Sequence, residues 1–336
     1  MTLALFRRGD PDRVSGGLKA PSVPKRPRPK IGIALGAGVA RGWAHIGALQ
    51  ELEAIGVRPD VIVGSSIGAV VGGCYAAGRL DALDGFARSL TKRGVFNLID
   101  VSFSGAGLIG GSRLRNRLEA ALGSSRVEEM PIKFVAVATE IGTGHEVWLK
   151  KGSIVEAMRA SYALPGLFEP VRIGGRWLFD GAIVNPVPVN VARACGAERV
   201  IALSIAAETG AGGTAVHDDS VADLIEAELA PPVTEKPTTL FDTLRRSLWS
   251  RRAWSHSEDE PPGLASVMVN TFNITQDRIM RSRLAGDPPD FMLTLKTGKF
   301  GLFEFHRADE LIELGRVSVR RAKDEILEQL ELAHVA

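Results

Sequence analysis

A strand, a tight turn and a helix meet at Ser66, and no other stretch constrains the fold as strongly. Val61–Val63 is a β-branched run typical of a strand, and Ala69–Ala77 is an apolar run of helical length. Between them stands GSSIG at 64–68, a G-x-S-x-G motif that predicts a turn too tight for a Cβ beside the serine. Such a turn holds the hydroxyl at the carboxyl edge of a sheet, above the amino end of a helix. The residues of this predicted nucleophile turn are Gly64, Ser65, Ser66 and Gly68.

The same stretch allows two simpler interpretations. A G-x-S-x-G sequence also arises by chance in a chain with 37 glycines. Residues 61–78 are uncharged, and Gly64, Gly68 and Gly72 are spaced as on the contact face of a membrane helix dimer. The run is barely long enough to span a bilayer, and its glycines and serines lower its hydropathy, which disfavours a membrane helix.

A β-α-β unit leads into the serine turn and favours the catalytic interpretation. Lys30–Leu35 is a predicted strand, Gly36–Gly42 a glycine-rich loop, and Trp43–Ile55 a helix with regularly spaced apolar residues. The two strands of such a unit are parallel, so the loop and the Ser66 turn emerge at the same sheet edge. If those strands are neighbours, backbone N–H groups of the loop can line the space beside the serine hydroxyl.

A glycine-rich loop after a first strand is also typical of dinucleotide-binding proteins. That fingerprint requires a third glycine where this chain has Arg41, and an acidic residue at the end of the second strand. Here the nearby acid, Asp60, precedes the strand instead. The sequence therefore disfavours a nucleotide cofactor.

Composition and charge limit the class of protein. A chain of 336 residues with 45% hydrophobic content suits one large α/β domain with tails. A net charge of +2 gives no overall field that would favour nucleic acid. Cys74 and Cys195 form no disulfide or metal pattern, and the amino-terminal apolar run is too short for a secretion signal. We therefore expect a cytoplasmic protein.

The predicted catalytic domain spans residues 30–325. Residues 1–29 are expected to be a disordered basic tail, with contact to an anionic membrane as a second interpretation. Residues 207–265 are expected to be a flexible, partly amphipathic insertion, and 326–336 the end of the last helix and a tail. Inside the insertion, Leu240–Trp254 combines an apolar helix face with four arginines. It suits peripheral contact with an inner membrane face and, equally, a helix that caps the core or contacts another subunit.

Apolar runs, turn residues and helix signals predict the remaining elements. Gly174-Gly175 is a two-residue turn between Val171–Ile173 and Arg176–Phe179, which predicts a β-hairpin just before Asp180. Ser153 begins a capping box at the start of a short helix. Further strands are expected at 133–138, 200–205 and 291–295, and further helices at 186–194, 271–284 and 308–332.

A nucleophilic serine requires a base, and two residues are candidates. His306 follows Asp180 in the chain order Ser, acid, His, but charged residues after His306 favour a helix-start role for it. Asp180 stands between Phe179 and Gly181 at the end of an apolar strand, where apolar neighbours can raise its pKa. Such a carboxyl group can share a proton with a serine, so Asp180 is the stronger candidate, with a turn or helix-cap aspartate as the simpler alternative.

These motifs in this order resemble the patatin-like phospholipase family, and most closely its bacterial RssA-type branch. The resemblance rests on LGAGVARGWAHIGAL at 35–49, VGSSIGA at 63–69, ASYALPGLFEPV at 160–171 and LFDGAIVNPVPV at 178–189. The segments RSRLAGDPPD at 281–290 and GLFEFHRADE at 301–310 are similar to the same branch. The resemblance implies an α/β fold, a three-layer sandwich with a mostly parallel central sheet and helices on both faces.

The resemblance also implies a Ser–Asp dyad without histidine. Ser66 would be the nucleophile and Asp180 the base, followed by Gly181 and Ala182 of a D-G-A motif. Backbone N–H groups around Gly38–Ala40 would hold the oxyanion, and Arg41 would orient the loop. Many family members have three glycines where this chain has Ala37-Gly38-Val39, so Val39 restricts the loop. The full oxyanion loop would be Gly36, Ala37, Gly38, Val39, Ala40, Arg41 and Gly42.

The function that the resemblance implies is a serine acyl hydrolase of the phospholipase A or lysophospholipase type. It would cleave carboxylic esters of phospholipids or lysophospholipids through an acyl-serine intermediate. No cofactor, metal or nucleic acid is expected, and the oligomeric state stays open. The alternative is a regulatory or scaffold protein that keeps the fold and turns over little, because every motif residue can also persist for packing.

Overall fold

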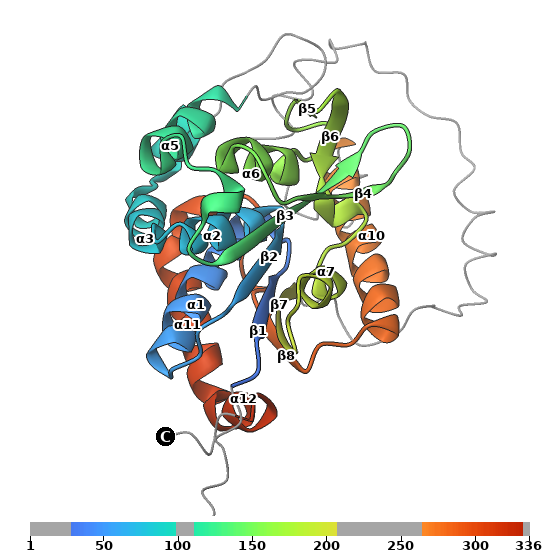
Figure 1. The fold of residues 1–336 in the computed structure, drawn as a ribbon. Helices are drawn as coiled ribbons and strands as arrows, with labels where there is room; N and C mark the ends of the chain where they lie inside the picture. Colours follow the sequence, from blue (N-terminus) through green and yellow to red (C-terminus); the bar gives the residue numbers. More distant parts are fainter. Residues whose placement is uncertain (1–27, 99–110, 207–263, 332–336) are drawn as a thin grey trace, which may run out of the picture.

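The computed structural model describes residues 28–98, 111–206 and 264–331 (Figure 1). The predicted basic tail up to residue 27, almost all of the insertion, and the amphipathic segment Leu240–Trp254 lie outside these ranges, so the domain boundaries stay predictions. Within the described ranges, no helix combines the length and the hydropathy needed to cross a bilayer.

Eight strands of the described chain form one sheet in the order β5-β6-β3-β2-β1-β7-β8, with β4 also paired to β3. The pairings β1–β2, β1–β7, β2–β3 and β7–β8 are parallel. The pairings β3–β4, β3–β6 and β5–β6 are antiparallel, and the last is the predicted glycine-turn hairpin. The strands are β1 (Ile31–Leu35), β2 (Val61–Ser65), β3 (Lys133–Glu140), β4 (Glu146–Leu149), β5 (Val171–Ile173), β6 (Arg176–Asp180), β7 (Arg199–Ala206) and β8 (Phe291–Lys296).

Helices cover both faces of the sheet, as Figure 1 shows. The α-helices are α1 (Ala44–Ala54), α2 (Ile67–Ala76), α3 (Leu80–Ser89), α4 (Lys92–Leu98), α5 (Ser112–Leu122), α6 (Ile154–Tyr162), α7 (Val189–Ala194), α10 (Leu264–Gly286), α11 (Ala308–Arg321) and α12 (Lys323–Gln329). The 3-10 helices are η1 (Val39–Trp43), η2 (Val127–Glu129), η3 (Gly181–Ile183) and η5 (Phe305–Arg307).

The alternation of side chains along the strands creates two hydrophobic cores. Ile33 and Leu35 of β1 join a core with α1, α2, α6 and α11 on one face. Ala34 of β1, with Val63 of β2, joins a second core with α7 on the other face, against which side chains of α10 also pack. The predicted α/β sandwich of three layers, with a mostly parallel sheet, is therefore confirmed.

One expectation about a single element is wrong, and one strand was not foreseen. The carboxyl-terminal helix expected at 308–332 is divided at Ala322 into α11 and α12. The break lets Ile326 and Leu330 turn into the core, where both are fully buried. Strand β4 was not expected, because its four residues show no clean alternation and form a strand only by pairing with β3.

Candidate active site

Ser66 joins β2 to α2 in a backbone conformation that residues with side chains rarely adopt. Its φ is 58° and its ψ is −127°, which is a strained combination for any residue except glycine. A Cβ on Gly64 would lie under 3.0 Å from the Gly68 carbonyl, and one on Gly68 under 3.0 Å from the Leu35 carbonyl. Only glycine at these two positions allows the ends of β1 and β2 and the start of α2 to meet.

Ser161, in the last turn of α6, holds this strained backbone in place. Its Oγ accepts a hydrogen bond from the Ser66 N–H at 3.0 Å and donates one to the Val137 carbonyl at 2.6 Å. Ser161 is fully buried, so the Ser66 N–H would have no water to replace this partner. Sequence reasoning missed this residue, although it stands in the segment at 160–171 that carries part of the family resemblance.

The Ser66 hydroxyl donates a hydrogen bond to a carboxyl group 114 positions away in the chain. Its Oγ lies 2.7 Å from Oδ2 of Asp180. Asp180 ends β6 and lies opposite Ala138 of β3, the strand next to β2. The second carboxyl oxygen, Oδ1, accepts the N–H of Ala182 at 2.8 Å. The structure thus brings together the two residues that the sequence analysis singled out.

The backbone around Asp180 is fixed on three sides. Its N–H donates to the Ala163 carbonyl at 3.0 Å, and its carbonyl accepts the Thr139 hydroxyl at 2.9 Å. A Cβ on Gly181 would lie under 3.0 Å from the Val137 carbonyl, so the chain can turn this close to β3 only at a glycine. These contacts orient the carboxyl group toward Ser66.

Burial raises the pKa of Asp180 to about 7. The residue is 1% exposed, and the lost hydration of the carboxylate outweighs the hydrogen bonds from Ala182 and Ser66, which favour the charged form. A carboxyl group that titrates near neutral pH can take a proton from a serine and later return it to a leaving group. The pair therefore has the properties of a nucleophile and its general base.

No histidine in the described structure forms a hydrogen bond with Ser66 or Asp180. His306 lies in η5, and desolvation lowers its pKa. His45 in α1 is fully buried, and its Nε2 lies 2.8 Å from the Gly36 carbonyl. Burial lowers the pKa of His45 to about 4, so the ring is neutral at pH 7 and donates from Nε2 to the first residue of the glycine-rich loop.

The glycine-rich loop lies beside the nucleophile turn. A Cβ on Gly42 would lie under 3.0 Å from the side chain of Ile67, the residue after Ser66. The N–H groups at positions 36, 37, 40 and 41 already donate to carbonyls, among them that of Ala40 to Leu302 at 3.0 Å. Among the described residues, no backbone hydrogen bond uses the N–H of Gly38 or Val39. Val39 has a φ of 52°, which is strained for a β-branched residue.

The turn between β8 and η5 holds this loop from outside. The Arg41 side chain donates from Nε to the Phe300 carbonyl at 2.7 Å, next to the bond from Ala40 to Leu302. Arg41 is half-buried there, and desolvation lowers its pKa, with Glu304 opposing the shift. Arg41 thus ties the loop to the carboxyl-terminal part of the chain, a contact that no local sequence pattern signals.

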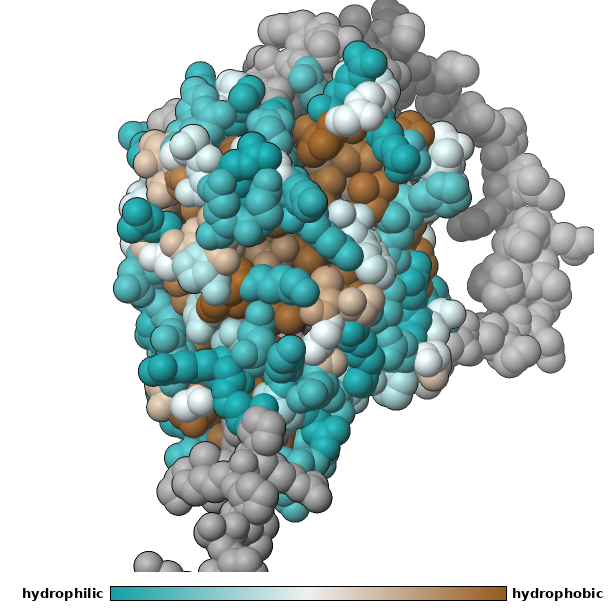
Figure 2. All heavy atoms as spheres, in the orientation of Figure 1, coloured by the Kyte–Doolittle hydropathy of each residue, from teal (hydrophilic) through white to brown (hydrophobic). Residues whose placement is uncertain are grey.

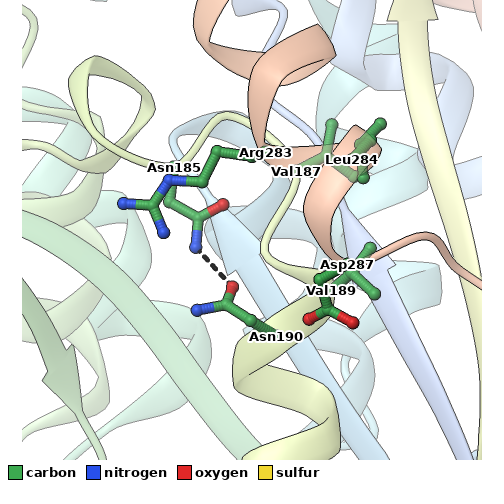
Figure 3. A pocket seen from close by; sticks show the side chains of 7 residues that line it. All are labelled: Asn185, Val187, Val189, Asn190, Arg283, Leu284 and Asp287. Atoms are coloured by element: carbon green, nitrogen blue, oxygen red, sulfur yellow. Dashed lines mark hydrogen bonds between the residues drawn. The ribbon is translucent and has the colours of Figure 1, made fainter.

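Ser65, the last residue of β2, hydrogen-bonds elsewhere than at the Ser66–Asp180 pair. Its Oγ donates to the Asn185 carbonyl at 2.6 Å. Asn185 also lines a pocket of about 150 Å³ between α7 and α10, in which its amide donates to Asn190 at 2.8 Å (Figure 3). Neither Ser66 nor Asp180 is among the residues that line this pocket. No cluster of three metal-binding side chains is present in the described ranges.

Comparisons with known proteins find a matching family model and several similar chains. The family model described as patatin-like phospholipase matches residues 33–193. An uncharacterized NTE family protein of Mycobacterium tuberculosis is 34% identical, over 88% of this chain and 91% of its own length. Lysophospholipase NTE1 of Pyricularia oryzae is 25% identical, over 85% of this chain and 18% of its own length. Among solved structures, VipD from Legionella pneumophila covers 92% of this chain and 78% of its own, with 14% identity and a TM-score of 0.34.

The similarity to the mycobacterial protein extends over nearly the whole length of both chains. The residues that match the family model, 33–193, include positions 66 and 180. The chain therefore belongs to the patatin-like phospholipase family, with NTE family proteins among its relatives.

Proposed function

We propose that the protein is a serine acyl hydrolase that cleaves carboxylic esters of phospholipids or lysophospholipids. The observation that carries this proposal is the 2.7 Å hydrogen bond from Ser66 Oγ to the buried Asp180, at a strained strand-to-helix turn. Family membership supports the lipid substrate class, and the quoted motifs favour the RssA-type branch. A cytoplasmic location with peripheral contact at the inner membrane face stays a prediction.

In the first half-reaction, Ser66 Oγ attacks the ester carbonyl carbon while its proton passes to Asp180. The tetrahedral intermediate collapses, Asp180 returns the proton to the departing alcohol, and an acyl-Ser66 ester remains. In the second half-reaction, Asp180 takes a proton from water, and the hydroxide attacks the acyl carbon. The fatty acid leaves, and Ser66 regains its proton from Asp180. A carboxyl group with a pKa of about 7 is suited to both transfers at neutral pH.

The oxyanion of each tetrahedral intermediate would be held by the N–H groups of Gly38 and Val39. They are the residues of the predicted loop whose N–H groups have no backbone acceptor among the described residues. Removing one oxyanion donor typically costs about 3 kcal/mol of transition-state stabilisation. The strained φ of 52° at Val39 is the backbone feature that would turn these groups toward the substrate.

A panel of phospholipids and lysophospholipids, assayed with the parent protein and with Ser66→Ala, tests the proposal. We expect fatty acid release by the parent and none above background by the variant. Asp180→Asn should lose nearly as much activity, whereas His306→Ala should stay near the parent rate. Equal rates for the parent and Ser66→Ala would reject the proposal. Loss of activity in Ser66→Ala and His306→Ala but not in Asp180→Asn would favour a triad that uses His306.

The alternative, a scaffold with little turnover, is separated by a fluorophosphonate probe. Covalent labelling requires an activated serine, so labelling of the native protein at Ser66 supports the enzyme. Absence of labelling together with intact folding would favour the scaffold.

A further inference from the structure

The β5–β6 hairpin projects past the sheet at the edge where Ser66 and Asp180 meet. Strand β6 runs antiparallel to β3, with Asp180 opposite Ala138 and Leu178 opposite Glu140. Because β3 ends at Glu140, the start of β6 and its glycine turn lie beyond the carboxyl ends of the parallel strands. Figure 1 shows β5 and β6 together at the top of the molecule.

The tip of this hairpin and the adjoining turn after β3 present apolar side chains to solvent. Trp177 is 52% exposed and Ile141 is 43% exposed, and the Ile141 N–H donates to the Trp177 carbonyl at 2.8 Å. Phe179 lies two residues further along the same strand face and is partly buried. Figure 2 shows apolar residues gathered on the surface at the upper part of the molecule, over this region. An exposed aromatic patch on a folded domain generally marks a surface of interaction.

Positive charge accompanies the apolar patch. Arg172 lies opposite Trp177 in the hairpin register, and its guanidinium carbon is 5.9 Å from the centre of the indole ring. Arg176 has an exposed side chain, and its Nε lies 3.7 Å from Oε1 of Glu140. The two arginines thus place positive charge on both sides of the tip, Arg172 beside the exposed indole ring and Arg176 beside Glu140.

We propose that this hairpin tip, comprising Arg172, Arg176 and Trp177 together with Ile141 of the adjoining turn after β3, docks the protein onto a bilayer that contains anionic lipids. Tryptophan favours the boundary between headgroups and acyl chains, and arginines beside it are attracted to lipid phosphates. The proposal rests on the proposed lipid hydrolase function, because docking here presents ester groups to the sheet edge that carries Ser66.

Vesicle flotation of the full chain carrying Ser66→Ala measures docking without turnover. The vesicles are mixed phosphatidylglycerol and phosphatidylcholine, with pure phosphatidylcholine for comparison. We expect binding to the mixed vesicles to fall about tenfold when Trp177→Ala is added, a loss that corresponds to the burial of one large side chain. Ile141→Ala should weaken binding less, and Arg172→Gln should reduce the preference for anionic vesicles. Ile274→Ala, which removes an apolar side chain 57% exposed on α10, is the matched control and should bind like its parent.

Equal binding by the Trp177→Ala, Ile141→Ala and control proteins would overturn the proposal, and so would loss of binding only after deletion of residues 240–254. A parent that binds neither kind of vesicle would also overturn it and would leave a protein partner as the occupant of this surface.

A second assay uses the protein with Ser66 intact. Trp177→Ala should lower hydrolysis of vesicle lipids and leave hydrolysis of a water-soluble short-chain ester unchanged. A protein that floats through the hairpin tip but hydrolyses no ester would reject the proposed function and leave the docking surface supported. Unchanged hydrolysis of vesicle lipids by Trp177→Ala would reject the docking surface and leave the hydrolase supported.

Discussion

The hydroxyl oxygen of Ser161 accepts the backbone N–H of Ser66 at 3.0 Å and so connects helix α6 to the strained turn of the nucleophile. A φ of 58° at a serine persists only where neighbouring groups hold it. Ser161 provides that restraint, and it is itself held to β3 because its hydroxyl donates a hydrogen bond to the Val137 carbonyl at 2.6 Å. The position of the nucleophile therefore depends on a residue 95 positions away that need not touch the substrate.

Ser161→Ala should lower the free energy of unfolding by about 1–3 kcal/mol, because it leaves a buried N–H without an acceptor. The rate of fluorophosphonate labelling should fall about tenfold or more, because the turn loses its restraint. Ser161→Cys separates packing from hydrogen bonding, since it fills the same space with a weaker acceptor. Full recovery of stability and labelling in Ser161→Cys would attribute the effect to packing alone.

The pH dependence of activity should follow Asp180. A general base must be deprotonated, and the pKa of Asp180 is raised to about 7. The kcat/KM for a soluble ester should therefore rise from pH 5 and level off above an apparent pKa of about 7. A profile that levels off near pH 4 would mean that the carboxyl group is not the titrating base.

The free energy of unfolding should also depend on the titration of Asp180, but it should fall as pH rises, whereas the activity increases. The pKa of Asp180 is about 7 in the folded protein against an ordinary value of 3.8, so the unfolded chain loses this proton first as pH rises. Between pH 4 and 7 the parent should lose up to about 1.4 kcal/mol of unfolding free energy per pH unit relative to Asp180→Asn, which does not titrate. Denaturant unfolding at several pH values measures the difference between the two proteins. Parallel curves would contradict the raised pKa.

Gly68→Ala should destabilise the protein by about 2–3 kcal/mol or more, because the new Cβ would overlap the Leu35 carbonyl and backbone cannot yield as a side chain can. Gly85→Ala is the matched control, since Gly85 is exposed in α3 and nothing lies within 4 Å of its added Cβ. That control should gain about 0.5–1 kcal/mol from helix propensity. Thermal unfolding of both variants would show whether the turn tolerates a Cβ, and equal behaviour would contradict the close approach.

Arg41→Lys should lower kcat with little change in KM, because it keeps the charge but loses the Nε donor that holds the loop to Phe300. A charge-assisted hydrogen bond contributes about 1.5–3 kcal/mol, so the loss should be roughly tenfold or more. Arg281→Lys, on the exposed surface of α10 and paired only with Asp277 among the described residues, should leave kcat unchanged. A rise in KM at constant kcat in Arg41→Lys would instead indicate direct substrate binding by Arg41.

Local patterns determined several elements of this protein. The strand, turn and helix around Ser66 follow from β-branched residues, two glycines and a small-residue helix, all within 17 consecutive positions at 61–77. The Gly174-Gly175 hairpin and the Ser153 helix cap, whose Oγ accepts the Glu156 N–H, also depend only on neighbouring residues. Short, continuous apolar runs indicated the central strands, which are buried on both faces. Short-range sterics and periodicity set these features, so they can be read without knowing the rest of the chain.

Only the tertiary structure decided how the site is assembled. Pairing of β6 with β3 places Asp180 beside Ser66, packing of α6 supplies Ser161, and the turn after β8 supplies the acceptor that occupies the Ala40 N–H. The tertiary structure also decided the division of the last helix at Ala322, because no glycine or proline marks that position. The division allows two side chains that follow it to be buried in the core. Each of these contacts joins residues far apart in the chain. Their geometry depends on which strands and helices become neighbours, and no local sequence window contains that information.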